Sequence, residues 1–181
     1  MRHGQTTANA KHIYAGEMDV LLTQKGEQQA AEAADRLPSR IDVVVCSPLT
    51  RARETAQIAL QSRGFNPDTF LVDERLREKH GGAISGLTYT EIAQKYPAEW
   101  DRENTSFEDV VSIRFPQGES DLDVVARVEE ALAALEQRYH NQHILIVAHA
   151  GIMLAARYIW GKSEQEVLGD IPSCGIDVYP A

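Results

Sequence analysis

The stretch HILIVAHAGIMLAARYIWG, residues 143–161, decides the fold class of this chain. Its first half is a continuous apolar run, which predicts a strand buried on both faces. Its second half continues directly into an apolar helical pattern that ends at Gly161, a residue type common just after helices. A buried strand that leads straight into a helix is the repeating unit of parallel sheets. His149 stands at the junction of the two halves.

The same strand-to-helix unit occurs a second time. IDVVVCS (41–47) is another apolar run, and SPLTRARETAQIALQSRG (47–64) follows it as a helix with Gly64 at its C-terminal cap. The other expected elements are strands at TFLVDE (69–74) and GIDVY (175–179), a helix from the cap Thr23 to about Leu37, and a helix from the cap Ser120 to about Tyr139. We expect the second of these helices to bury one face, which carries Leu122, Val125, Val128, Ala131, Leu132 and Leu135. The pattern therefore predicts an α/β fold, a three-layer α/β/α sandwich with a mostly parallel central sheet.

The domain organisation follows from the absence of repeats and of linker-like segments. A chain of 181 residues fits one domain, so we assign residues 1–181 to a single unit. Residues 75–118 lack a strand pattern and carry short helical signals, such as the capping box of Thr88 and Glu91. We expect this segment to be a lid-like insertion within the domain.

Composition restricts the partners. The net charge of −9 and pI near 5.1 oppose binding to nucleic acid or to an anionic membrane. A bound anion must therefore be small enough to sit in a local basic pocket. Two cysteines, Cys46 and Cys174, do not make a disulfide framework, and no secretory signal is visible, so we expect a cytoplasmic protein. The sequence has no HExxH or CxxC spacing, and no metal site is expected. An exposed edge strand would allow a homodimer.

Several polar residues stand where predicted strands end and helices begin. They are Arg2 and His3 in the first residues, Arg51, Glu78 and His149. Because loops at the carboxyl ends of parallel strands meet at one edge of the sheet, we expect these side chains to converge. An imidazole can carry a phosphoryl group, guanidinium groups can bind its oxygens, and a carboxylic acid can protonate the leaving alkoxide. Each residue taken alone also has an ordinary reading: a lone histidine after a strand is usually a core residue, and a loop carboxylate is usually solvated.

Six blocks of sequence, in order along the chain, strengthen the catalytic interpretation. They are RHGQTTAN (2–9), LTQKGEQQA (22–30), CSPLTRARETA (46–56), LREKHGGAISGLT (76–88), FPQGES (115–120) and IVAHAGIM (146–153). Together they resemble the histidine phosphatase superfamily, which includes the phosphoglycerate mutases. In size the chain is closest to its small-phosphatase branch, such as the α-ribazole phosphatases.

The resemblance implies a role for each matching residue. His3 is the phosphorylated nucleophile, Glu78 is the proton donor, and the phosphoryl oxygens are held by Arg2, Arg51 and His149. Asn9 matches the asparagine that the family places near the phosphate. Phosphoryl transfer through a histidine requires no metal, and no cofactor is expected.

Physical chemistry adds expectations about protonation. His3 must be neutral at the attacking nitrogen, so we expect a backbone carbonyl to hold its other ring nitrogen. Beside a phosphate dianion, His149 should be charged and the pKa of Glu78 should be raised. Gly4 should let the backbone approach the phosphate closely.

The start of the chain departs from the family pattern. Family members carry a short apolar strand before RHG, in the middle of the sheet, whereas only Met1 precedes it here. We therefore expect that the first central strand is missing from this sequence. If the chain is complete, its catalytic loop should be disordered.

Three functions agree with these observations. The first is a metal-independent phosphatase that hydrolyses a small phosphate monoester through a phosphohistidine, with a small phosphorylated metabolite as its partner. The alternatives are a cofactor-dependent phosphoglycerate mutase and a non-catalytic phospholigand-binding protein. A phosphoprotein phosphatase would need a site wide enough for a peptide. The apolar side chains of the expected lid favour a substrate with one phosphate and a partly apolar body.

Overall fold

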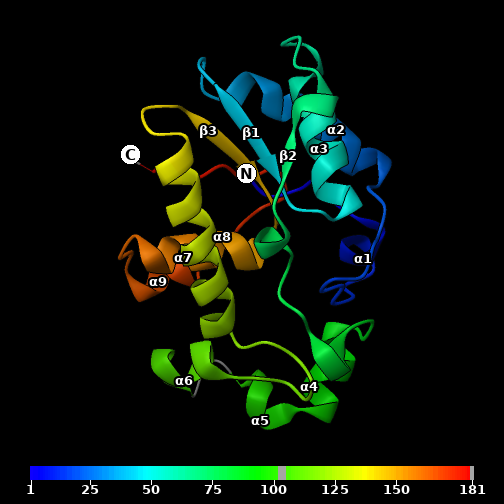
Figure 1. Ribbon diagram of the computed structural model, residues 1–181. Helices are drawn as coiled ribbons and strands as arrows, with labels where there is room; N and C mark the ends of the chain where they lie inside the picture. Colours follow the sequence, from blue (N-terminus) through cyan, green and yellow to red (C-terminus); the bar gives the residue numbers. More distant parts are fainter. Residues whose placement is uncertain (102–104, 180–181) are drawn as a thin grey trace.

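A three-stranded parallel sheet forms the centre of the molecule (Figure 1). The middle strand β1 (Val43–Cys46) pairs in parallel with β2 (Leu71–Val72) on one side and with β3 (Ile144–Val147) on the other. The structure is a computed structural model that describes residues 1–101 and 105–179. The predicted parallel arrangement is confirmed for all three strands.

Helices cover both faces of this sheet, as a three-layer sandwich requires. On one face α2 (Gln24–Ala33) and α3 (Thr50–Gln61) pack small side chains against alternate residues of β1 and β3. On the other face lie α7 (Asp121–Arg138) and α8 (Ala150–Ile159). The apolar runs of the strands therefore reflect burial on both faces, and the predicted α/β/α fold is confirmed.

Most helix ends agree with the sequence signals. Thr23 accepts a hydrogen bond from the Gly26 amide at the start of α2, and Ser120 forms a capping box with Asp123 at the start of α7. The face predicted for α7 was partly wrong, because Leu122 is 38% exposed. The carboxylate of Asp121 is buried instead.

The first three residues extend the sheet beyond β3. The Met1 amino group donates to the Ile146 carbonyl at 2.7 Å, the Ala148 amide donates to the Met1 carbonyl, and the His3 amide donates to the Ala148 carbonyl. The Val147 carbonyl lies on the β1 side of β3, where it accepts from the Ser47 amide. The backbone groups of residues 146 and 148 that bind residues 1–3 therefore lie on the opposite side of β3. Residues 1–3 are therefore held in place by backbone hydrogen bonds, and the disordered loop that we considered is not what the structure describes.

The segment between β2 and α7 forms a separate group of short helices. They are α4 (Tyr89–Lys95), α5 (Pro97–Trp100) and α6 (Phe107–Ser112), and Figure 1 shows them together at the end of the molecule away from the sheet. Ile84, Ile92 and Phe115 form the centre of a small apolar cluster of their own. Ile84 and Phe115 of this cluster also line the cavity that is described below.

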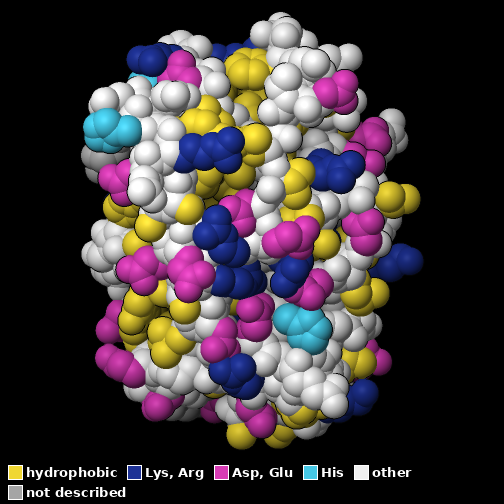
Figure 2. All heavy atoms as spheres, viewed as in Figure 1, with side chains coloured by type: hydrophobic (Ala, Val, Ile, Leu, Met, Phe, Trp, Pro, Cys, Tyr) yellow, Lys and Arg dark blue, Asp and Glu magenta, His cyan; other side chains and the backbone are white. Residues whose placement is uncertain are grey.

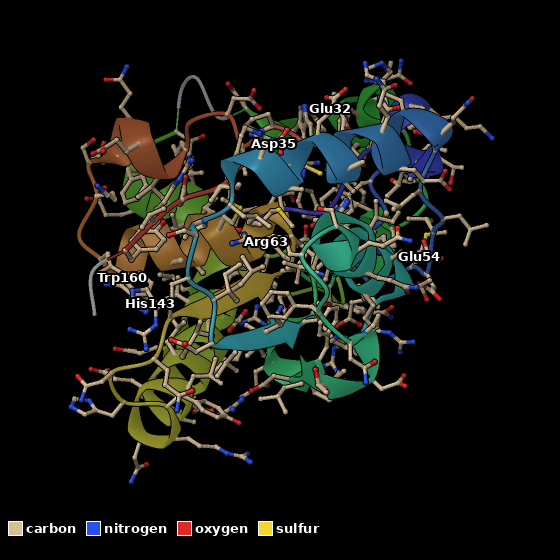
Figure 3. The ribbon with its side chains drawn as sticks, turned by 90° about the horizontal axis from the view of Figure 1, so that it is seen from above. Glu32, Asp35, Glu54, Arg63, His143 and Trp160 are labelled. Carbon is tan, nitrogen blue, oxygen red and sulfur yellow. The ribbon has the colours of Figure 1, made fainter. Side chains whose placement is uncertain are left out.

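The remaining elements are short. They are α1 (Thr7–Ala10), α9 (Glu164–Val167) and four 3₁₀ turns at Ala34–Arg36, Pro67–Thr69, Glu74–Leu76 and Gly82–Ile84. The strand predicted at residues 175–179 was wrong, because the chain there is irregular. Its side chains pack individually: Asp177 pairs with Arg157, and Tyr179 stacks on Trp160, which Figure 3 labels.

The surface mixes charges of both signs. Figure 2 shows lysine and arginine side chains beside aspartate and glutamate side chains across the middle of one face. Within the described residues, no helix is both long enough and apolar enough to cross a bilayer.

Candidate active site

The predicted polar residues converge on one cavity. Its volume is about 190 Å³, and Arg2, His3, Asn9, Arg51 and Glu78 contribute to its wall. His149 is fully buried directly behind His3, with the two ring centroids 5.2 Å apart. The six residues come from four parts of the sequence, namely residues 2–9, Arg51, Glu78 and His149, so the fold assembles the site.

The imidazole of His3 is held in one tautomer. Its Nδ1 lies 2.7 Å from the Gly4 carbonyl oxygen, and Nδ1 must therefore carry the proton that it donates there. Nε2 keeps its lone pair and accepts a hydrogen bond from Arg51 Nε at 3.3 Å. Burial and the nearby Arg51 lower the pKa of His3 to about 3. The expectation of a backbone carbonyl is confirmed, and the neutral ring has an unprotonated Nε2 that faces Arg51.

The loop that carries His3 is packed tightly against two helices. The Gly4 amide donates to Thr55 Oγ1 at 3.0 Å, and Thr55 in turn donates to the Arg51 carbonyl at 2.6 Å. A Cβ on Gly4 would lie 2.4 Å from the Gly26 carbonyl oxygen at the start of α2. Gly4 therefore allows a close backbone-to-backbone contact, whereas our explanation had been an approach to the phosphate.

Two arginines supply positive charge to the cavity. Arg51 is buried, and its guanidinium group is fixed by donating to the Met18 carbonyl at 2.8 Å and to the Gly16 carbonyl at 2.7 Å. Arg2 donates to the Ile171 carbonyl, while its Nε is buried without a partner among the described residues. Fixed guanidinium groups with unused N–H donors are suited to phosphoryl oxygens.

His149 is positioned by Ser47, a residue that sequence reasoning missed. Ser47 Oγ lies 2.7 Å from His149 Nε2, and His149 Nδ1 has no partner among the described residues. Burial, Arg51 and His3 lower the pKa of His149 well below its ordinary value. These surroundings favour a neutral ring. The charged His149 that we expect beside a phosphate dianion stays a prediction. His149 is not among the described residues that line the cavity, so its contact with a phosphoryl group stays a prediction.

Glu78 is held by two backbone amides, one from the next residue in its loop and one from the start of α8. Its Oε1 accepts from the Lys79 amide at 2.9 Å and from the Gly151 amide at 3.1 Å. No hydrogen bond from residues 1–101 or 105–179 engages Oε2. The carboxyl group therefore has one anchored oxygen and one that can exchange a proton with a ligand.

The loop around Glu78 is fixed from α7. Arg127 donates to the carbonyls of Arg75, Arg77 and Glu78 and pairs with Glu119 at 2.9 Å. Sequence reasoning missed this arginine, since no local pattern links residue 127 to residue 78. The position of Thr55 could have been predicted, because it lies four residues after Arg51 and therefore on the same face of one helix.

Asn9 lies in the cavity wall, but its side-chain oxygen is already used. Oδ1 accepts from the Thr6 amide at 3.0 Å and from the Thr6 hydroxyl at 2.9 Å, as part of the capping box of α1. The amide nitrogen of Asn9 is left to face a ligand. Within residues 1–101 and 105–179, no three His, Cys, Asp or Glu side chains converge as metal ligands would.

The lowered pKa of His3 predicts a pH dependence of stability. An unfolded histidine titrates near about 6.5, so the unfolded chain binds more protons than the folded chain between that pH and about 3. Stability is then lost as pH falls through this range, by up to about 1.4 kcal/mol per pH unit for one such group. We expect His3→Asn to flatten the decline of the free energy of unfolding between about pH 6 and 4.5. Urea unfolding across this pH range measures the free energy of unfolding. If it declines equally steeply with falling pH in the wild type and in His3→Asn, the prediction is contradicted.

Comparison with known proteins agrees with this geometry. The family model described as "Histidine phosphatase superfamily (branch 1)" matches residues 1–173. Phosphoglycerate mutase-like protein 4 of Arabidopsis thaliana is 35% identical over 156 residues, which cover 84% of this chain and 66% of that protein. The metal-independent phosphoserine phosphatase of the same plant is 31% identical over 86% of this chain and 64% of its own length. The chain thus spans slightly less than two thirds of the length of these curated relatives.

A solved structure supports the same assignment. A mycobacterial glucosyl-3-phosphoglycerate phosphatase in complex with VO3 superposes with a TM-score of 0.81 at 30% identity, over 96% of this chain and 87% of that chain. Phosphatases and mutase-like proteins are both among the relatives. The matched family model and this shared fold establish that the chain belongs to branch 1 of the histidine phosphatase superfamily.

Proposed function

We propose that this chain is a metal-independent phosphatase that hydrolyses a small phosphate monoester through a phosphohistidine at His3. The observation that carries the proposal is the state of His3: its ring is neutral, Nδ1 is tied to the Gly4 carbonyl, and Nε2 is available beside Arg51. A neutral, oriented imidazole with fixed cations next to it is what attack on phosphorus requires.

The proposed reaction has two steps. In the first, His3 Nε2 attacks phosphorus, the bond to the ester oxygen breaks, and Glu78 gives its proton to the departing alcohol. In the second, Glu78 takes a proton from water, and the resulting hydroxide displaces the phosphoryl group from His3 as inorganic phosphate. Arg2, Arg51 and the Nδ1–H of His149 stabilise the negative charge on the phosphoryl oxygens in both steps.

The charge of the cavity favours hydrolysis over a phosphoglycerate mutase reaction. Among the described residues, three cations line the cavity, namely Arg2, Arg51 and Lys79, and Lys79 is already paired with Asp121. Arg114 pairs with Asp123 at 2.7 Å and is not among the described residues that line the cavity. Within the described residues, Arg2 and Arg51 form no salt bridge. Two such positive charges match one phosphate dianion, whereas a bisphosphorylated cofactor would bring several more negative charges.

The products of the reaction test this proposal. With excess chelator present, we expect release of inorganic phosphate from monoesters. With 3-phosphoglycerate and a trace of 2,3-bisphosphoglycerate, ³¹P NMR should detect inorganic phosphate and no accumulation of 2-phosphoglycerate. Accumulation of 2-phosphoglycerate would indicate the mutase, and a folded protein that binds phosphate without turnover would indicate the non-catalytic alternative.

Gly151 provides a test of the role of Glu78. A Cβ at residue 151 would lie 2.4 Å from Glu78 Oε1, so we expect Gly151→Ala to push the carboxyl group out of place. The carboxylate is the mobile end of its side chain, and alanine favours the helix, so folding should survive. We expect alkyl phosphate hydrolysis to fall by about 10-fold or more while the melting temperature stays equal or rises. Unchanged hydrolysis of alkyl phosphates would contradict the assigned contact.

Location and assembly are part of the same proposal. Cys46 and Cys174 are buried free thiols, which supports a reducing cytoplasm. The edge strand β2 exposes Val72, which supports a homodimer through that edge. Sedimentation velocity checks the second point, and a monomer at all concentrations would contradict it.

A further inference from the structure

A buried ion pair lies in the same cavity and has no part in the chemistry proposed above. Lys79 Nζ lies 2.8 Å from Asp121 Oδ1, and the two side chains are only 9% and 6% exposed. Both residues line the cavity together with His3 and Glu78. A buried pair of this kind adds little net stability, so stability alone does not explain it.

The pair has unused hydrogen-bonding capacity. Asp121 Oδ2 is buried and has no partner among the described residues. Lys79 Nζ carries three N–H donors, and Asp121 is the one acceptor that the described part of the chain provides for them. Buried polar atoms in native proteins are nearly always satisfied, which indicates that a ligand completes both groups.

The position of Asp121 at the start of α7 does not explain this arrangement. Acidic residues favour the first turn of a helix because of its dipole. Asp123 already serves that end of α7, since it forms the capping box with Ser120 and is partly exposed. Asp121, in contrast, turns its carboxylate into the cavity wall.

The chemistry of the pair selects the group that it binds. The charges of Lys79 and Asp121 neutralise each other. An anionic ligand would have to compete with Asp121 for Lys79, and a cationic ligand would have to compete with Lys79 for Asp121. A hydroxyl group does not compete, because it can donate to Asp121 Oδ2 and accept from Lys79 Nζ at the same time. The lid side of the cavity carries Tyr89 and Trp100, stacked with ring centroids 5.8 Å apart, which can cover the C–H surface of a carbon chain or ring.

We propose that Lys79 and Asp121 form a subsite for a hydroxyl group on the alcohol portion of the substrate. The substrate class is then a monophosphate ester of a neutral polyol or sugar. This inference rests on the proposed phosphatase function and adds the part of the substrate that does not react.

The test compares two substrates that differ in their hydroxyl groups. Glycerol 1-phosphate and propyl phosphate have the same number of carbons and the same ester bond. We expect the wild-type protein to prefer glycerol 1-phosphate by about 10- to 100-fold in kcat/KM, the range for a hydrogen bond to a charged group. In the double variant Lys79→Met/Asp121→Leu the ratio of the two kcat/KM values should fall close to one. Changing both residues avoids leaving one buried charge without its partner, which would threaten folding.

Asp123→Asn is the matched control. It removes a carboxylate two residues away at the same helix end, outside the cavity, and should lower stability without changing the substrate ratio. A wild-type ratio near one, or a ratio that survives in the folded double variant, would overturn the subsite.

The outcomes separate this proposal from the one on which it rests. If wild-type protein does not hydrolyse p-nitrophenyl phosphate in the presence of chelator, the phosphatase function itself fails. If it does and the hydroxyl preference is absent, only the subsite fails. A preference for phosphoserine over glycerol 1-phosphate that disappears in the double variant would mean that the pair binds an ammonium and a carboxylate, which would also overturn the hydroxyl assignment.

Discussion

His3→Ala is expected to lower kcat for p-nitrophenyl phosphate by about 10⁴- to 10⁶-fold, the scale seen when a nucleophile is removed from an enzyme. The reason is geometric: no other side chain offers a neutral nitrogen that is oriented by a backbone carbonyl and flanked by Arg51, within the described part of the cavity. His149 cannot replace it, because its ring packs behind His3 and its Nε2 is bound to Ser47.

The control for this prediction is His143→Ala. His143 lies at the surface, where Figure 3 labels it, and pairs with Asp42 rather than with any cavity residue. We expect nearly full activity from this variant. Steady-state kinetics with pure, folded proteins check both variants. A His3→Ala protein that retains a tenth of the wild-type rate would show that His3 is not the nucleophile.

Glu78→Gln is expected to show an effect that depends on the leaving group. Hydrolysis of an alkyl phosphate such as glycerol 1-phosphate should fall by about 10²- to 10⁴-fold, because the alkoxide cannot leave without a proton. Hydrolysis of p-nitrophenyl phosphate should fall much less in its first step, since p-nitrophenolate is a stable anion. Glutamine keeps an oxygen for the amides of Lys79 and Gly151, so the backbone around the site should be preserved.

Glu74→Gln is the matched control for the acid. Glu74 belongs to the same charged run, but its side chain is 69% exposed and pairs with Arg77. We expect this variant to behave like the wild type with both substrates. Pre-steady-state release of each alcohol gives the measurement, and equal losses with both substrates in Glu78→Gln would show that Glu78 is not the proton donor.

Much of the fold and of the candidate site could be predicted from the sequence, because these features depend on local patterns. Continuous apolar runs located β1 and β3, and the residues just after them, Arg51 and His149, were expected at one edge of the sheet for that reason. Residues with cap chemistry, such as Thr23 and Ser120, marked helix starts correctly. Each of these signals lies within a few residues of the feature that it predicts.

The groups that orient Arg51 and Glu78 could not be predicted from local patterns. The carbonyls of Gly16 and Met18 that fix Arg51, and the contacts of Arg127 with the Glu78 loop, join segments more than thirty residues apart. Every residue has a backbone carbonyl, so the amino-acid sequence does not show which carbonyls accept these hydrogen bonds. The burial of Asp121 was missed for another reason: amphipathic spacing favoured Leu122, whereas the ion pair with Lys79 determines which side chain turns inward.

The central claim is that the reaction passes through a phosphorylated His3. Its most direct test is rapid quenching of wild-type protein with ³²P-labelled p-nitrophenyl phosphate, followed by mass spectrometry of peptides kept at alkaline pH, where phosphohistidine survives. The account predicts an acid-labile phosphoryl group on His3, formed and lost as fast as turnover, and none in His3→Ala. Turnover without a phosphorylated protein, or a phosphoryl group on any other residue, would contradict it.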